Sequence, residues 1–525
     1  MTVTGRPRVR GISRFAIAYL LLAPLYVAPL VATRFLPAFD LPHHVALADA
    51  LAKAGPGSPY ARLYVIDLAL APFDTHFALL VLLSKAMSLR VAAKVLVGMQ
   101  VLLLPLACAR LLAARRRSTV PALLTFPLGF GMPVHYGLLA FVVALPILVW
   151  ALAEAADERA WIDRPCRQAV VLGAALLALF FAHLEAYLIG VVTAIVAVAL
   201  HSGAAPRRAL GLGAALPSLG ALFVYGLHER ATGPSLAGAF AEAAMAQMRA
   251  EGVLGRLVLR TGALPIHLLR GFNDGLDVVA SCVFFAAVPV LCVMAGRVRD
   301  GGDADDRPRA AAGIAVALAA LAAYYLLPHH VHPHAHSIYP RFAVLVAVIA
   351  LLAIPARLTL ARSAILNGLT TALAFITACY AGILWYEYRQ FGRELTDFEE
   401  VLRDVPPGHS AAGLVFDASS RVMNVEGIVS GFPAYYVTER PAATSATWLY
   451  YCGQPHLPCR LRDPDAPPAL PHFMQPEALD PGRALTAVDL FLVRDGPAAD
   501  EIFGAQSDRV RLIARHGRWR AFRRR

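Results

Sequence analysis

Charged residues are scarce in this chain of 525 residues: they form 16% of it, whereas soluble proteins carry about 25%. The hydrophobic share is 58%, and the mean hydropathy is +0.57. The apolar residues gather in long runs, and a bilayer span requires roughly 20 of them. This composition excludes a single water-soluble domain and a disordered chain. We expect a polytopic α-helical membrane protein with about 11 transmembrane helices.

Lysine, cysteine and the motifs of nucleotide chemistry are also rare. The chain has three lysines, so arginine supplies nearly all of its basic side chains, and the net charge is +12. Because the arginines stand between apolar runs, the positive-inside rule explains them, and we expect no nucleic-acid partner. Seven cysteines are too few for a disulfide scaffold. No Walker A, Rossmann, HExxH or GxSxG motif stands in a supporting context, which argues against an ATPase.

The apolar runs define the predicted spans. The first follows four arginines and is long for a signal peptide, so we interpret it as an uncleaved span. The apolar segment 73–90 is expected to be re-entrant or juxtamembrane, because a further crossing would move Arg115–Arg117 to the outer face. The predicted spans lie near residues 15–33, 91–113, 119–132, 136–153, 168–182, 186–200, 209–227, 276–295, 310–327, 341–354 and 364–384.

The loops between these runs differ in charge, and the difference predicts the orientation. Arginines occupy one set of loops, whereas the alternate short loops at 133–135, 183–185 and 328–340 contain no lysine or arginine. This asymmetry places the N-terminus in the cytoplasm and the C-terminus in the periplasm of a bacterial inner membrane. Two large outer segments follow from it, the loop 34–90 and the C-terminal segment 387–525.

The chain therefore divides into a membrane domain, 1–386, and an outer domain, 387–525. Segment 228–273 is apolar on one face and suits a helix that lies on the membrane surface. In the outer domain, Pro406-Pro407-Gly408 ends a helix, and the apolar runs Gly413–Phe416 and Val488–Val493 indicate buried strands. A hairpin is expected around His516-Gly517, so the domain is predicted to be a periplasmic α/β domain.

Two cysteines, Cys452 and Cys459, share the outer domain. Because the periplasm is oxidising, we expect them to form a disulfide. The alternative is two separate buried thiols.

The first outer loop contains an acid followed by two histidines: Asp40, His43 and His44. Pro42 suits the first turn of a helix, on which the two histidines would lie close to Asp40. A carboxylate beside imidazoles can accept a proton and hold a polar substrate, so these residues are the catalytic candidates. The alternative is that Asp40 only caps the helix.

Two further acid–histidine pairs are candidates for substrate binding. Asp74 and His76 precede an apolar run, where Asp74 is also a plausible helix cap. His183 and Glu185 lie at the junction of two predicted spans, and ionisable residues at such depth are functional candidates. The alternative for the second pair is a turn between helices whose polar residues contact water.

A histidine-rich loop, His329–His336, is the candidate for a divalent metal, since neutral imidazole binds zinc, copper and nickel. The alternative is a solvated polar loop, because no carboxylate or cysteine lies within it. Arg341 follows at the outer boundary. Its planar donor fork suits a phosphate, and it could equally extend to lipid headgroups.

Four features occur together in this chain: an acid–histidine group after the first span, a basic stretch before a span that ends in Arg-Arg, a Pro-Arg-aromatic start of a late span, and an outer α/β domain. Their residues are Asp40, His43 and His44; His76, Lys85, Leu89, Arg90 and Ala93; Pro340, Arg341 and Phe342; and Val488–Arg494 with Trp519, Phe522 and Arg523.

This combination resembles the GT-C class of membrane glycosyltransferases, which includes the protein mannosyltransferases and the bacterial lipid A aminoarabinose transferases. The resemblance implies transfer of a sugar from a polyprenyl-phosphate donor to a lipid, glycan or protein, with Asp40 as the base and Arg341 on the phosphate. The acidic pair usual after the first span is here one acid, which keeps a non-catalytic assembly subunit as an alternative. A transporter or flippase with a proton relay through His183 and Glu185 is the other, although the chain lacks the internal repeats of many transporters.

Overall fold

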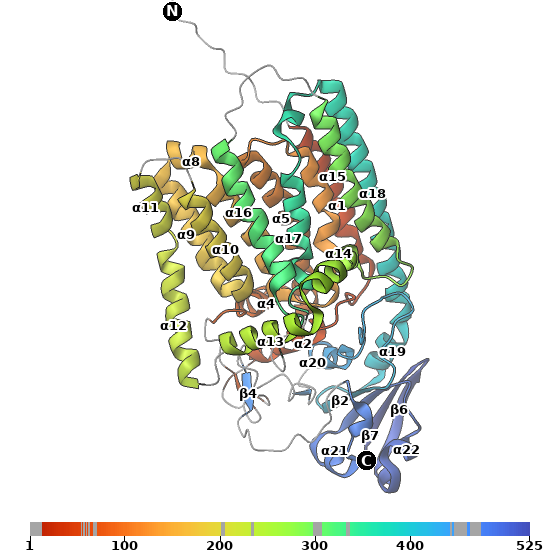
Figure 1. Ribbon diagram of the computed structural model, residues 1–525. Helices are drawn as coiled ribbons and strands as arrows, with labels where there is room; N and C mark the ends of the chain where they lie inside the picture. The colour runs from red at the N-terminus through yellow and green to blue at the C-terminus, as the bar shows by residue number, and fades with distance from the viewer. Residues whose placement is uncertain are drawn as a thin grey trace, which may run out of the picture.

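The computed structural model describes a helical bundle with a small β-sheet domain at one end (Figure 1). The described residues are 13–53, 55, 58, 60, 64–66, 71–200, 205–232, 236–297, 307–331, 337–440, 444–445, 459–461 and 474–525.

Seven helices in the described ranges are long and apolar enough to cross a membrane, and five shorter apolar helices accompany them. The polytopic helical architecture that the sequence predicts is therefore confirmed. The long helices are α1 (Arg14–Ala32), α5 (Leu89–Ala114), α7 (Leu139–Ala156), α9 (Pro165–Ala182), Ala205–His228 (α11, Ala205–Gly213, with most of α12, Leu216–Thr232), α15 (Leu276–Gly296) and α18 (Ser363–Glu394). The shorter apolar ones are α4 (Thr75–Ser84), Val120–His135, α10 (Leu184–Ala199), Val316–Leu326 of α16 (Arg307–Leu326), and Pro340–Leu352, which joins η3 (Pro340–Phe342) to α17 (Ala343–Leu352).

One predicted span has a different form. Residues 119–132 do not form one straight helix. They belong instead to three short helices, η1 (Val120–Thr125), η2 (Pro127–Phe130) and α6 (Met132–His135). Each piece has a proline at its first or second position, where the missing N–H costs nothing. Inside a continuous helix the same prolines would each remove a hydrogen bond, so the chain restarts three times.

The two ends of the bundle differ. Helix α1 begins at the end remote from the sheet domain, whereas α2 (Leu41–Lys53) and α4 lie at the sheet end (Figure 1). Helix α4 has 10 residues and a length of about 15 Å, so it is too short to cross a bilayer.

Helices α13 (Leu236–Glu251) and α14 (Val253–Leu269) meet at a bend of 95°, and they count as an eighth span only if they are taken together. Gly252, with φ +66°, forms the joint. In Figure 1, α13 runs across the direction of the spans. Leu254 and Leu259 of α14 are exposed, which suits a helix pair on a membrane surface.

In the described part of the chain the sheet domain contains five strands in the order β3-β2-β5-β7-β6, of which β3 (Thr444–Ser445) is the shortest. Strands β2 (Ser410–Val415) and β5 (Leu490–Arg494) are parallel, and β7 (Trp519–Arg524) joins them antiparallel. Strand β6 (Val510–His516) pairs with β7 through the predicted turn and forms the edge. The predicted α/β domain is therefore confirmed.

The two faces of this sheet have different cores. On one face Phe491 and Phe522 pack with α21 (Pro481–Ala487) and α22 (Ala499–Phe503). On the other face Leu492 and Ala521 belong to the apolar core of the bundle. Helix α18 continues past the bundle into α19 (Thr396–Asp404), which packs on β6 and β7. The sheet is therefore attached directly to the membrane domain.

The predicted disulfide lies outside the described residues, because Cys452 is not among them and nothing is described of the Cys459 side chain. It stays a prediction. The backbone of β4 (Cys459–Leu461) pairs antiparallel with β1 (Tyr64–Ile66), so the first outer loop and the outer domain share a two-stranded sheet.

Candidate active site

Asp40 lies directly before α2, as the sequence predicts, and its backbone is fixed by a neighbouring segment. The amide of Asp40 donates to the carbonyl of Tyr136 at 3.1 Å, and the amide of Phe39 donates to the carbonyl of His135 at 2.9 Å. The carbonyl of Asp40 accepts the amides of His43 and His44 at 3.0 and 3.1 Å, which are the first bonds of the helix. The position of Asp40 therefore depends on residues 135–137.

Gly137 makes this arrangement possible. Its φ of +75° lies in the region that side chains rarely adopt, and an added Cβ would lie 2.7 Å from the amide nitrogens of Asp40 and Leu41. Only glycine allows the two backbones to approach this closely.

Arg341, in η3, is brought to the same place from a distant part of the chain. Its side chain is buried, and its Nε donates to the carbonyl of Ser337 at 3.1 Å. Its Nη1 lies 3.2 Å from Nε2 of His183. The carboxylates of Asp40 and Glu185 both act on its positive charge. Arg341, His183 and Glu185 therefore form one cluster, and Asp40 lies near enough for its charge to act on the guanidinium.

The hydrogen bonds of His183 follow from the chemistry of arginine. A guanidinium only donates, so Nε2 of His183 must accept from Arg341. Nδ1 of His183 lies 2.9 Å from Oε2 of Glu185, and the amide of Ala186 donates to the same Nδ1 at 3.4 Å. The imidazole therefore stands between the cation and the carboxylate, and its contact with Nη1 restrains the direction of the guanidinium.

Aromatic rings surround this connection. The rings of Phe73 and Phe141 meet His183 edge-on at centroid distances of 4.9 and 5.2 Å. Phe73 has φ +76°, an unusual conformation for a bulky residue. Such strain concentrates at functional sites, where the surrounding structure holds it. The segment before α4 therefore contributes to the site through Phe73.

The other predicted histidines separate into two environments. Nε2 of His76 lies 3.0 Å from Nδ1 of His44, and the rings contact edge-on. Burial of His76, together with the charge of His44, lowers the pKa of its imidazole well below the usual range. His43 lies instead against Gly431, where an added Cβ would be 2.6 Å from Nε2 of His43. His43 therefore faces the outer domain, whereas His44 faces α4.

Asp74 occupies the position before α4, but its carboxylate makes no cap bond to that helix. It accepts the amide of Ala71 at 3.1 Å and is buried. Its role as a helix cap, one of the sequence interpretations, is therefore wrong.

No group of three or more potential metal ligands occurs within the described ranges. Most of the histidine-rich loop, residues 332–336, lies outside them. The amide of His329 donates to Oε1 of Gln247 at 2.7 Å, which ties the start of this loop to α13.

Two buried arginines of α14 escaped the sequence analysis. Nη1 of Arg256 donates to the last turn of α16 at Leu326, and Nη1 of Arg260 donates to the carbonyls of Tyr324 and Leu327 at 2.9 and 2.8 Å. The guanidinium of Arg260 lies 3.7 Å from the ring centre of Tyr339, in cation–π contact. The sequence does contain a pattern that could have revealed them, because Arg256 and Arg260 stand four positions apart in an apolar helix.

These two arginines retain unused donors. Nη2 of Arg256 and Nε of Arg260 are buried without an acceptor in the part of the chain that the structure describes. Since Tyr339 stands two residues before Arg341, α14 is connected to the main cluster.

Comparisons with known proteins identify the fold. No protein-family model and no curated protein matches the sequence. Among solved structures, ArnT from Cupriavidus metallidurans bound to undecaprenyl phosphate is similar over 98% of both chains, with a TM-score of 0.54 and 13% identity. The mycobacterial arabinofuranosyltransferase AftD is similar over 98% of this chain and 42% of its own length, with a TM-score of 0.46 and 12% identity.

Proposed function

We propose, on the premise that this chain has the fold of the GT-C membrane glycosyltransferases, that it transfers a sugar from a polyprenyl-phosphate donor to a lipid, glycan or protein acceptor. The observation that carries the proposal is that Asp40 and Arg341, which are far apart in the sequence, lie close enough in the fold for the carboxylate to act on the guanidinium charge. The loop charges favour the outer face of a bacterial inner membrane for this site.

In the proposed reaction an acceptor hydroxyl attacks the anomeric carbon of the sugar. The new bond joins the acceptor oxygen to that carbon, while the bond from the carbon to the donor phosphate breaks and its electron pair goes to the phosphate oxygen. Asp40 takes the proton of the hydroxyl as general base. Arg341 stabilises the negative charge that grows on the leaving phosphate.

His183 and Glu185 act as positioning residues for Arg341. Because His183 accepts from Nη1 and the carbonyl of Ser337 accepts from Nε, the fork is held in one orientation before the substrate arrives. Such preorganisation avoids reorganisation during the reaction. Arg256 and Arg260 are second candidates for the phosphate, since a buried N–H without an acceptor costs free energy that an anion would recover.

The test is transfer of labelled sugar from a polyprenyl-phosphate donor by the purified full-length protein in detergent. Asp40→Asn keeps the shape of the side chain and removes its basicity, so we expect the rate to fall by about 10²–10⁴. Arg341→Ala should raise the KM for the donor, because it removes a phosphate partner. Asp49→Asn is the matched control: this carboxylate is also buried on α2, but it binds Lys53 and Tyr60.

Asp49→Asn should leave transfer near the wild-type rate. Wild-type turnover in Asp40→Asn would show that Asp40 is only a structural residue. No turnover by the wild-type protein over a broad panel of donors and acceptors would favour a non-catalytic assembly subunit or a transporter.

A further inference from the structure

The last two strands of the outer domain carry a segregated charge. Between Arg509 and Arg525 the chain has eight arginines and no acidic residue. The acids of the outer domain all precede this segment, so the end of the printed sequence carries basic side chains and no acidic ones.

Some of these arginines are neutralised by the body of the domain. Arg518 pairs with Asp417 and Asp495, and Nη2 of Arg524 lies 2.7 Å from Oδ1 of Asp489. These pairs attach the hairpin to the rest of the sheet and account for two of the eight charges.

Four others form what we call the arginine quartet: Arg509, Arg511, Arg523 and Arg525. Within the described ranges none of them has an ion pair, and the only hydrogen bond of their side chains runs from Nη1 of Arg509 to Oε1 of Gln506 at 2.9 Å. Arg509, Arg511 and Arg525 are exposed, and Arg523 is half-buried.

The register of the hairpin places the quartet on one face. Arg511 is directly opposite Arg523, and the amide of Arg525 donates to the carbonyl of Arg509 at 2.8 Å. Opposed side chains have Cβ atoms about 4.5–5.5 Å apart, and residues two apart on a strand share a face. Four arginine side chains therefore start from neighbouring positions on one face, with no acidic side chain between them.

Like charges directly opposite each other destabilise a sheet. Protection of the edge strand β6 against pairing with other chains explains some charge, since edge strands commonly carry it. It does not explain Arg523, which belongs to the interior strand β7. The repulsion between Arg511 and Arg523 has no stabilising role in the fold, so it indicates a surface where an anion binds and neutralises the charge.

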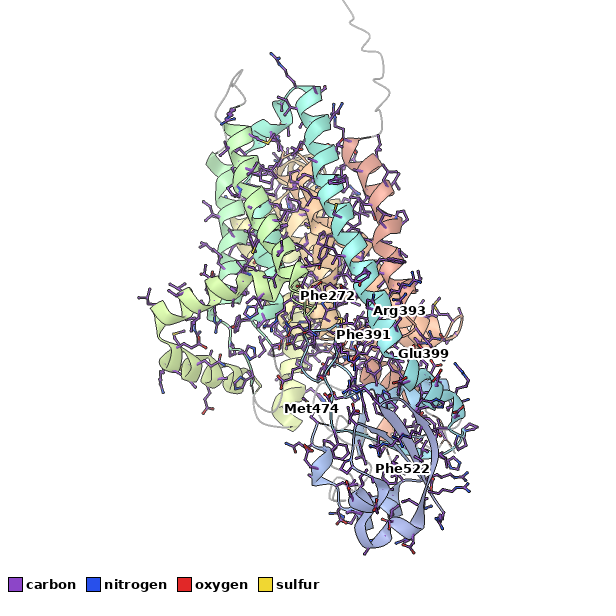
Figure 2. The ribbon with its side chains drawn as sticks, turned by 90° about the vertical axis from the view of Figure 1, so that its right-hand side faces the viewer. Phe272, Phe391, Arg393, Glu399, Met474 and Phe522 are labelled. Carbon is purple, nitrogen blue, oxygen red and sulfur yellow. The ribbon has the colours of Figure 1, made fainter. Side chains whose placement is uncertain are left out.

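We propose that the arginine quartet binds an anionic glycan, one that carries carboxylate or phosphate groups along a sugar chain. A lipid headgroup is disfavoured, because β7 runs away from the bundle toward the C-terminus (Figure 1) and Phe522, next to Arg523, lies within the sheet domain beyond the end of the bundle (Figure 2). A protein partner is disfavoured because interfaces need an apolar centre, and Leu512 is the large apolar side chain exposed on these two strands.

A glycan fits this surface through charge alone. Guanidinium groups bind carboxylate and phosphate through paired hydrogen bonds. A stiff sugar chain also loses less conformational entropy on binding than a flexible polypeptide of equal charge. This surface is separate from the site of Asp40 and Arg341, and its binding does not require the transfer reaction.

The experiment uses the full-length protein in a neutral detergent and labelled polygalacturonate as the probe, with binding measured by fluorescence anisotropy over a series of salt concentrations. The variant is Arg511→Gln/Arg525→Gln. The matched control is Arg403→Gln/Arg421→Gln, which removes the same charge from two exposed arginines elsewhere in the outer domain.

The wild-type protein and the control should bind with the same affinity, which falls as salt rises. The quartet variant should bind at least about tenfold more weakly. Its plot of log affinity against log salt concentration should also be less steep, by about one to two in the size of the slope. Equal loss in the control would reduce the effect to net charge and overturn the proposal. Polyglutamate binding as tightly as polygalacturonate would overturn the glycan assignment. No binding by the wild-type protein would leave edge protection as the explanation.

Discussion

Replacing Gly137 with alanine should impair the reaction by displacing Asp40. Alanine at φ +75° costs about 1–2 kcal/mol of backbone strain. Its Cβ would also lie 2.7 Å from two amide nitrogens, so the backbone of Asp40 must retreat by about 0.7 Å to reach the 3.4 Å of ordinary contact. Because a misplacement of about 1 Å can cost ~10² in rate, we expect Gly137→Ala to lower kcat by roughly ten- to a hundredfold.

Gly275→Ala separates the two effects. Gly275 has φ +73°, but an added Cβ would have no atom within 4 Å, so this variant introduces the same strain without displacing Asp40. Both variants should lose thermal stability, Gly137→Ala the more because of its added contacts, and only Gly137→Ala should lose transfer. The assay is labelled-sugar transfer beside a thermal unfolding curve in the same detergent. Equal loss of kcat in both variants, or full activity of Gly137→Ala, would refute the role of Gly137.

Three further outcomes are expected. The hydrogen bond to Asp404 raises the pKa of His516 above its ordinary value near 6.5. The stabilisation by this bond is therefore fully present below about pH 6.5 and is lost as the pH rises through the pKa of the folded state. In Asp404→Asn the pKa of His516, measured by NMR, should be lower than in the wild type. Glu154→Ala should lower the unfolding free energy by about 2 kcal/mol, because it removes the buried carboxylate that binds Arg110 and Gln168 while Arg110 keeps Asp157. Thermal melts that match the wild type would contradict this. A periplasm-dependent reporter fused after Arg525 should be active, whereas activity of a cytosolic reporter there would reverse the orientation.

The sequence predicted the helices because a long apolar run inside a bilayer must satisfy its own backbone hydrogen bonds, and a helix does so within one segment. It also predicted the hairpin around His516-Gly517, since the turn residues stand between two strand-like runs. The form of 119–132 was missed because hydropathy does not register the prolines that divide it. The neighbours of Asp40 were missed because they depend on contacts far apart in the sequence. The sequence around Arg341 does not show that His183 orients its side chain. The sequence around Gly137 does not show that the backbone of Asp40 lies against it.

The outer domain helps to hold the site. Gly431 leaves space for His43, and Gly427 leaves space for the ring of Phe39, where an added Cβ would lie 2.9 Å from Cε2. Phe39 and His43 flank Asp40 in the chain, so the outer domain contacts the residues on both sides of the proposed base.

The same segment is fixed to the membrane helices by charge. Glu439 of α20 (Tyr436–Glu439) accepts Nη2 of Arg34 at 2.5 Å and Nε of Arg90 at 3.0 Å, and these arginines stand just after α1 and at the start of α5. A carboxylate that binds two guanidiniums constrains both the helix ends and the loop that carries it. The position of the segment around Asp40 is therefore set by the outer domain as well as by the bundle, and the two domains share one apolar core.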